Sequence, residues 1–230
     1  MKSKERWRVE CQGLLTTSAG GKVAEMVRQL DEYRQSRQLF VSPDPALEQV
    51  RINVLLDGKE LIVPGPGLKE GFYRLCPFKT GHAKLAMAVS LRGIPTCGQL
   101  LPHQELPKLS IGMLIAEALA VDAQGNRLGD GSGFFDLACA ILQQCGALVS
   151  TPSIWAAALC QASEPLPIDP WDVRMSGLLG PDKVVRFPLQ PGLLGIDWQQ
   201  LSRKRIKKLT PLWKEWQKIH PPAIEGAESE

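Results

Sequence analysis

Three glycines alternate with other residues in Gly129–Gly133, and a charged side chain stands on either side of them. Arg127 lies two residues before the first glycine, and Asp136 lies three residues after the last. A guanidinium and bare backbone N–H groups bind phosphate oxygens, and a carboxylate can hold Mg²⁺ against a phosphate. The spacing therefore indicates a phosphate-binding loop. A plain glycine-rich turn is the alternative, with Asp136 a carboxylate that only complements a helix dipole.

The segments on both sides of the glycines predict how such a loop is held. Ile111–Val121 is the most apolar segment of the chain and predicts a central buried strand. Apolar residues at helical spacing predict a helix over Leu137–Cys145, which Gly146 ends. When a buried strand is followed by a turn and then by the first residues of a helix, backbone N–H groups and the positive end of the helix dipole face an anion.

Other glycine motifs fail on spacing. The dinucleotide-binding fingerprint needs a glycine where Phe134 stands. The Walker motif needs a hydroxyl residue after Gly-Lys, but Val23 and Glu60 occupy that position. A nucleophile elbow needs glycines two residues on either side of Ser132, where Asp130 and Phe134 stand instead.

The first half of the chain predicts a parallel sheet. Leu39–Val41 and Leu61–Val63 read as short buried strands with a helix between them, and that pattern is a βαβ unit. Further predicted elements are a helix over 18–38, an extended segment over 71–77, a helix over 82–91, an irregular connection over 94–109, a strand over 153–159, an edge strand over 184–187, and a helix from Asp197 that Pro211 breaks or kinks.

Composition bounds the function classes. The chain has 230 residues, of which 44% are hydrophobic and 22% charged, and this is typical of one globular domain. A net charge of +3 is too weak to argue for nucleic acid. The charged N-terminus carries no secretory signal pattern, and no apolar run reaches the length of a membrane span, so we expect a cytoplasmic protein.

The spacing of the cysteines and histidines along the chain matches no short metal-binding motif. The six cysteines form no Cys-x-x-Cys pair and read as reduced, mostly buried thiols. The three histidines, His82, His103 and His220, lie far apart in the sequence, which argues against a His-rich zinc site.

The glycine segment resembles a motif of the 5-formyltetrahydrofolate cyclo-ligase family. That family carries Gly-x-Arg-Leu-Gly-x-Gly-x-Gly-Tyr-Tyr-Asp-Arg after an apolar strand. Gln161, Pro165, Pro167 and Asp172 give a looser match to a later part of the family pattern. The resemblance extends over residues 19–211. The matching residues are Asp122, Gly125, Arg127, Leu128, Gly129, Gly131, Gly133, Phe134, Phe135 and Asp136.

The resemblance implies a fold and a domain division. The fold would be a three-layer α/β sandwich around a mainly parallel sheet, of the sugar-isomerase and CoA-transferase type. Residues 19–216 would form the domain, after a basic segment at 1–18 and before a Pro-rich, acidic and disordered tail at 217–230.

The resemblance also implies a reaction. ATP with Mg²⁺ would phosphorylate the formyl oxygen of 5-formyltetrahydrofolate, and ring closure would give 5,10-methenyltetrahydrofolate. The partners would be ATP and a folate-like small molecule, with no membrane and no nucleic acid, in a monomer or dimer. Arg127 would be catalytic, Phe134 and Trp171 would contact substrate, and Asp136 and Asp172, with Asp169 also a candidate, would hold the metal. Nucleotide phosphates would lie on Arg127, Leu128, Gly129, Asp130, Gly131, Ser132, Gly133, Phe134 and Phe135.

Several positions differ from the family pattern. Ser132 replaces a lysine found in many members, Phe134 and Phe135 replace two tyrosines, and Asp130 adds a negative charge to the loop. Lys4, Arg6 and Arg8 are candidates for the cations that members carry on an N-terminal helix. The alternative function is therefore an altered paralogue that binds a nucleotide or folate without turnover.

The basic segment Arg203–Lys208 leaves a further alternative open. Beside Trp213 and Trp216 it indicates either RNA contact or a solvated basic face whose tryptophans pack inward.

Overall fold

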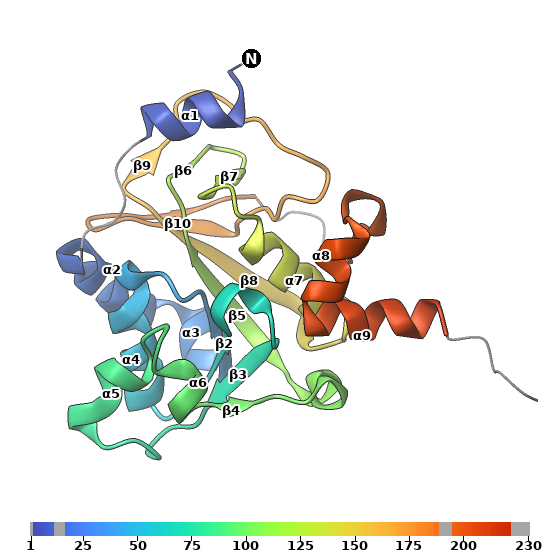
Figure 1. The fold of residues 1–230 in the computed structure, drawn as a ribbon. Helices are drawn as coiled ribbons and strands as arrows, with labels where there is room; N and C mark the ends of the chain where they lie inside the picture. The colour runs from blue at the N-terminus through green and yellow to red at the C-terminus, as the bar shows by residue number, and fades with distance from the viewer. Residues whose placement is uncertain (1, 12–16, 189–194, 222–230) are drawn as a thin grey trace, which may run out of the picture.

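The computed structural model describes residues 2–11, 17–188 and 195–221. An eight-stranded sheet runs through the molecule in the order β11-β10-β8-β5-β1-β2-β3-β4 (Figure 1). The five strands from β10 to β2 are parallel. At one edge β11 runs antiparallel to β10, and on the other side β3 runs antiparallel to β2 and to the edge strand β4. The strands of this sheet are β1 (Gln38–Val41), β2 (Glu60–Pro64), β3 (Phe72–Leu75), β4 (Gln99–Leu100), β5 (Ile111–Glu117), β8 (Leu148–Ala157), β10 (Gly177–Leu179) and β11 (Val184–Arg186).

A small second sheet, β7-β6-β9, extends from one end of the large one. It consists of β6 (Ala120–Val121), β7 (Arg127–Leu128) and β9 (Cys160–Gln161). The helices are α1 (Lys4–Glu10), α2 (Thr17–Gln29), α3 (Asp31–Gln35), α4 (Glu48–Leu56), α5 (Leu85–Ala88), α6 (Ile94–Cys97), α7 (Phe134–Gln144), α8 (Arg203–Lys208) and α9 (Thr210–Ile219). Short 3-10 helices cover 45–47, 66–68, 82–84, 103–108 and 198–200.

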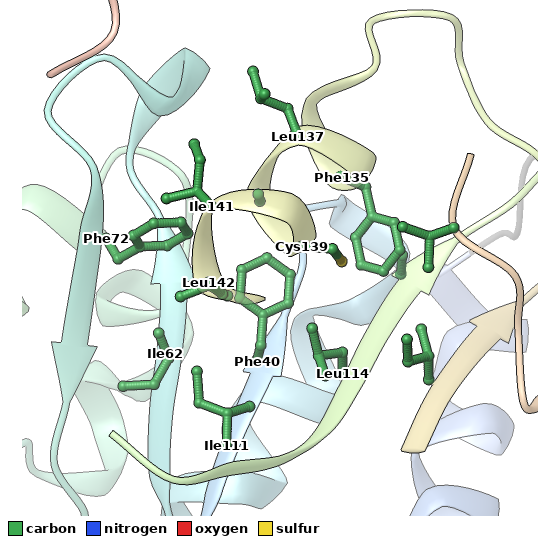
Figure 2. Packing of buried hydrophobic residues seen from close by; sticks show 14 of the residues in the cluster. Phe40, Ile62, Phe72, Ile111, Leu114, Phe135, Leu137, Cys139, Ile141 and Leu142 are labelled. Carbon is green, nitrogen blue, oxygen red and sulfur yellow. The ribbon is translucent and has the colours of Figure 1, made fainter. Parts of the chain in front are cut away.

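Helices cover both faces of the large sheet and make the fold three-layered. Successive residues of a strand point to opposite faces. Phe40 accordingly lies in the buried cluster that includes residues of α7, α8 and α9, whereas Leu39 and Val41 lie in the cluster that includes residues of α2 and α4. Figure 2 shows Phe40 and Ile62 on the sheet beneath the apolar side chains of α7. The predicted three-layer α/β class is therefore confirmed.

The predicted βαβ unit is present, as β1, α4 and β2 with β1 and β2 parallel. The segment over 71–77 contains β3, which returns antiparallel to β2. The expected edge strand near residue 185 is β11. Pro211 lies in the first turn of α9, so the expected break in the C-terminal helix is there as well.

Two predicted elements are divided in the structure. The central strand ends at Glu117, because Leu119 N–H donates to Leu128 O and β6 joins the small sheet. The helix predicted over 18–38 ends at Gln29, because Leu30 has extended backbone (φ −69°, ψ 135°) and α3 starts after it. Only short helical turns cover the helix predicted over 82–91.

The domain boundaries predicted near 18 and 217 both fall inside helices. The N-terminal boundary lies within α2, and α9 continues to Ile219. The rest of the predicted tail, 222–230, lies outside the described residues. In the described part of the chain, no helix combines the length and apolar character that crossing a bilayer requires.

Arg51 on α4 fixes the turn that follows β1. Its side chain is only 1% exposed, and it donates to Ser42 O (2.7 Å), Asp44 O (2.9 Å) and Val89 O (2.9 Å). Burial lowers the pKa of this guanidinium to about 10, so it stays charged at neutral pH. One buried cation thus satisfies three carbonyls that have moved out of water.

We predict that Arg51→Met lowers the free energy of unfolding by about 3 kcal/mol or more, because each buried carbonyl left without a donor costs about 1–3 kcal/mol. Urea unfolding followed by circular dichroism measures the change. The exposed Arg92→Met is the matched control and should stay within about 0.5 kcal/mol of the parent. Equal effects of the two substitutions would contradict the role of Arg51.

Candidate functional site

The glycine loop, Gly129–Gly133, connects β7 of the small sheet to the start of α7. Asp122 shapes the turn that leads to it and is 1% exposed. Its carboxylate accepts the N–H groups of Gln124 and Asn126, both at 2.9 Å, and that of Leu166 at 2.9 Å. Asp122, a residue of the family-like motif, therefore organises the backbone and does not face a ligand.

Each glycine of the loop meets a steric or conformational requirement. Gly131 and Gly133 have positive φ angles of +96° and +66°, which side-chain-bearing residues rarely adopt. A Cβ on Gly129 would lie 2.7 Å from Nη1 of Arg127. Gly129 thus leaves room for a protein guanidinium, whereas the sequence interpretation reserved that room for a phosphate.

Arg127 and Asp136 form an ion pair beneath the loop. Nη2 of Arg127 lies 2.7 Å from Oδ2 of Asp136, and the two side chains are 8% and 13% exposed. The other carboxylate oxygen accepts Val173 N–H at 3.0 Å. The guanidinium also donates to Glu117 O (3.2 Å) and lies over the Phe135 ring. The ion pair therefore joins β7, α7, the end of β5 and the segment before β10.

Asp130 occupies donor groups of the loop itself. Its Oδ1 accepts the Ser132 backbone N–H at 2.9 Å and the Ser132 hydroxyl at 2.8 Å. A phosphate bound to this turn would compete with a carboxylate for the same N–H. Residues 130–134 are exposed, so the loop surface is open to a ligand.

Two further guanidiniums approach the loop from the two ends of the chain. Nε of Arg8 on α1 donates to Gly129 O (3.0 Å), and Nη2 of Arg205 on α8 donates to Ser132 O (3.1 Å). Figure 1 shows α1 beside the small sheet and α8 beside α7. These two cations lie around the position where Ser132 replaces a lysine of the family pattern.

Two cavities lie next to the loop. The larger, about 380 Å³, lies at the carboxyl ends of β1, β2 and β5, where ligands bind in open α/β sheets. The smaller, about 240 Å³, lies between the start of α7, the segment near Asp172 and the stretch that leads into α8. The larger has apolar walls that include Phe40, Leu68 and Phe134, with Ser42 and Asp44 at its edge.

The structure distributes the predicted site residues between these cavities. Arg127, Asp130, Ser132, Phe134 and Phe135 line the larger one. Gly133, Asp136, Trp171 and Asp172 line the smaller one. The two residues predicted to contact substrate, Phe134 and Trp171, therefore face different cavities. Leu128 is 1% exposed and packs with Trp7, so only its backbone is available to a nucleotide.

The predicted metal ligands fit Mg²⁺ in donor chemistry, and each already has a cationic partner. Asp172 Oδ2 lies 2.5 Å from Lys4 Nζ and 2.7 Å from Asp169 N–H, and Asp169 also accepts from Lys4 (2.6 Å). Partial burial lowers the pKa of Lys4, but its two carboxylate partners outweigh burial and leave that pKa above its usual value. A metal at Asp136 and Asp172 would therefore compete with Arg127 and Lys4.

Sequence reasoning identified the loop but not all of its neighbours. Among the N-terminal cations it named, Lys4 and Arg8 reach the site, whereas Arg6 bonds to Glu10. The sequence pattern marks Arg205 only as part of the basic segment Arg203–Lys208, for which RNA contact is one alternative. Arg203 and Lys207 of that segment lie over Trp216 and Trp213. Ser42 and Asp44 were missed, although a polar pair directly after a buried strand is a recognisable signal.

Comparison with known proteins places the chain in a family context. Residues 3–181 match the model of the 5-formyltetrahydrofolate cyclo-ligase family. A human methenyltetrahydrofolate synthase domain-containing protein is 26% identical over 190 residues, which is 80% of this chain and 49% of that protein. The protein of the same name from Danio rerio is 29% identical over 198 residues, or 82% of this chain and 50% of its own length. This chain spans about half the length of these relatives.

Sequence similarity to a 5-formyltetrahydrofolate cyclo-ligase covers a shorter stretch of the chain. The 5-formyltetrahydrofolate cyclo-ligase of Escherichia coli K12 is 34% identical over 79 residues, which is 34% of this chain and 41% of that enzyme. Among solved structures, the 5,10-methenyltetrahydrofolate synthetase of Aquifex aeolicus has a TM-score of 0.48 and 22% identity, and the match covers 79% of this chain and 87% of that chain.

We predict that Arg127 and Asp136 are energetically coupled. Arg127→Met should lower the free energy of unfolding by about 3–5 kcal/mol, because it leaves a buried carboxylate without its cation. In the double variant with Asp136→Asn, the loss should be smaller than the sum of the single losses by about 1–3 kcal/mol. The exposed pair Arg186–Glu32 provides the control cycle, with coupling of about 1 kcal/mol or less. Strict additivity for Arg127 and Asp136 in urea unfolding would refute the coupling.

Proposed function

The chain belongs to the 5-formyltetrahydrofolate cyclo-ligase family, and from this premise we propose that it converts 5-formyltetrahydrofolate to 5,10-methenyltetrahydrofolate with ATP and Mg²⁺. The observation that carries the proposal is the convergence of Arg8, Arg127 and Arg205 on an exposed glycine loop between two cavities. Phosphoryl transfer is catalysed mainly by positioning and by neutralising charge, and guanidiniums at fixed places do both.

We assign the folate to the larger cavity. Its volume of about 380 Å³ lies within the range of small-molecule sites, about 300–1,000 Å³. The Phe134 side chain is 39% exposed beside Phe40 and Leu68, and an aromatic wall of this kind suits a flat heterocycle. The formyl group would then point toward Arg127, which lies on the wall of the same cavity.

We assign the nucleotide phosphates to the loop and the smaller cavity. At about 240 Å³ that cavity is too small for a whole nucleotide, and it suits phosphate groups near Arg205. Asp136 and Asp172 would hold Mg²⁺ there, together with phosphate oxygens. When bound, the ion would supply charge neutralisation on the transferred phosphoryl group.

Arg127 is the proposed catalytic residue. Arg127 lines the larger cavity and pairs with Asp136, which lines the smaller one, so its guanidinium can stabilise the negative charge that develops on the transferred phosphoryl group. Its bonds to Asp136 and Glu117 O hold it in one orientation before substrate arrives, so little reorganisation is needed during the reaction.

Turnover is tested by mixing the chain with 5-formyltetrahydrofolate, ATP and Mg²⁺ and following methenyltetrahydrofolate by absorbance. We expect product only when both ATP and Mg²⁺ are present. Asp172→Asn should reduce the rate about tenfold or more, because it removes a metal-binding carboxylate. Asp182→Asn, whose side chain is 82% exposed, should leave the rate unchanged. Absence of product from a folded chain that binds Mg–ATP would reject cyclo-ligase turnover.

The alternative is a family member that binds a nucleotide or folate without turnover. The hydrogen bonds from Ser132 to Asp130 favour it, because they occupy a phosphate donor and place a negative charge in the loop. Binding of Mg–ATP without product formation would support this alternative.

We predict that Asp130→Asn tightens Mg–ATP binding about fivefold. Asparagine keeps an oxygen for the Ser132 N–H but removes the charge that repels phosphate, an effect of about 1 kcal/mol at a solvated surface. Isothermal titration of the parent, Asp130→Asn and the control Asp182→Asn measures the difference. An unchanged or weaker affinity in Asp130→Asn would argue against phosphate binding at this loop.

A further inference from the structure

A second cluster of chemically active side chains lies at the end of α7 opposite the glycine loop. His103 comes from the 3-10 helix at 103–108, Cys145 directly follows α7, and Glu215 lies on α9. The Cys145 and Glu215 residues are 6% and 4% exposed, and the His103 side chain is 13% exposed. The ligand atoms of these three side chains all lie within 4.8 Å of one another, which is close enough to hold one metal ion.

The separations of the three ligand atoms approach those of a tetrahedral metal site. Glu215 Oε1 lies 2.6 Å from His103 Nε2 and 3.4 Å from Cys145 Sγ, and Cys145 Sγ lies 4.0 Å from His103 Nε2. A tetrahedral Zn²⁺ with one sulfur, one nitrogen and one oxygen ligand needs edges of about 3.3–3.6 Å. Shifts of less than about 1 Å in side-chain positions would therefore bring all three atoms into coordination geometry.

The surroundings of Glu215 orient one of its oxygens toward the other two ligands. Gln144 Nε2 donates to Oε2 at 3.1 Å, which leaves Oε1 toward His103 and Cys145. Hydrogen bonds of this kind fix ligand orientation in protein metal sites. Lys218 also pairs with Oε1. Its side chain is 57% exposed, so its ammonium can rotate outward into solvent when another cation binds Oε1.

From this arrangement we propose that His103, Cys145 and Glu215 form a binding site for a divalent transition metal such as Zn²⁺, with water as a fourth ligand, that fastens α9 to the end of α7. A thiolate, an imidazole and a carboxylate are together the ligand set of borderline-soft ions such as Zn²⁺, whereas Mg²⁺ and Ca²⁺ prefer oxygen ligands alone. The site is independent of the proposed cyclo-ligase activity and uses none of its residues.

Thiol catalysis is a poorer account of the same cluster. Burial and the neighbouring carboxylate raise the pKa of the Cys145 thiol to about 12, so it is not a nucleophile at neutral pH. Nε2 of His103 faces both Cys145 and Glu215. A catalytic relay needs the thiol on one ring nitrogen and the carboxylate on the other. A bound metal ion itself deprotonates a coordinating thiol, so a high thiol pKa does not oppose the metal site in the same way.

One structural feature opposes metal binding. His103 Nδ1 is buried and has no hydrogen-bond partner in the described part of the chain. A metal on Nε2 would place the ring proton on Nδ1 and leave that N–H unsatisfied, which would weaken metal binding about 5- to 150-fold. Structural zinc sites bind far more tightly than this loss, so the penalty would lower the affinity without abolishing it.

Cobalt substitution tests the site directly in the full chain. Titration of the metal-free protein with Co²⁺ should give one equivalent of tetrahedral cobalt, with visible ligand-field bands and a sulfur-to-cobalt charge-transfer band. Zn²⁺ should displace the cobalt and raise Tm. Cys145→Ser should abolish the charge-transfer band and weaken binding about 100-fold. Cys97→Ser, which removes an exposed thiol elsewhere, should change neither.

A second variant separates a metal site from a hydrogen-bond network. Lys218→Met removes the competing ammonium and should tighten Co²⁺ binding severalfold, whereas a purely structural network predicts no gain. Circular dichroism of each metal-free variant establishes that it is folded. Octahedral cobalt, absence of the sulfur band, or equal Co²⁺ affinity in the parent and in Cys145→Ser would overturn the proposal.

Discussion

The organisation of the glycine loop depends on the ion pair between Arg127 and Asp136. A buried ion pair recovers its desolvation cost only when further hydrogen bonds satisfy both partners. Here the additional bonds are those of Arg127 to Glu117 O and of Asp136 to Val173 N–H, while within the described residues the buried Nε of Arg127 has no hydrogen-bond partner. They join four separate segments at one point. The requirement for glycine at position 129 follows from the same pair, because a Cβ there would collide with the guanidinium.

The positive charge around the glycine loop comes from other residues than in the family pattern. Ser132 lacks the lysine charge, and Asp130 adds a carboxylate. Arg8 and Arg205 hold loop carbonyls from opposite ends of the chain, so their charges depend on the docking of α1 and α8. The cations around this loop therefore reach it only when both helices are docked in the folded domain.

Local patterns predicted the parts of this protein that short stretches of sequence determine. The βαβ unit, the glycine loop and the helix after it need only neighbouring residues, and the structure contains all three, although α7 begins at Phe134 and not at the predicted Leu137. The division of the central strand has one local mark, the charged Glu117 at the end of β5, but apolar residues resume up to Val121 while the partner strands change from β1 and β8 to β7 and β9. The pairings of Lys4 with Asp172 and of His103 with Glu215 span more than one hundred residues, so no periodicity marks them. Phe134 and Trp171 line different cavities, and this separation likewise arises only when loops from separate segments pack together.

The helix α7 connects the two polar clusters. Its middle is apolar and packs on the sheet through residues such as Leu142 beside Phe40 (Figure 2), so it has little freedom to slide. Its eleven residues extend about 16 Å, with the glycine loop before one end and Cys145 after the other. The C-terminal helices contact both ends, through Arg205 at the loop and Glu215 at Cys145. These two polar contacts act together with the buried Ile206, Leu209 and Leu212, which pack in the same core as α7, so the orientation of α8 and α9 is set by apolar packing as well as by the contacts at both ends of α7.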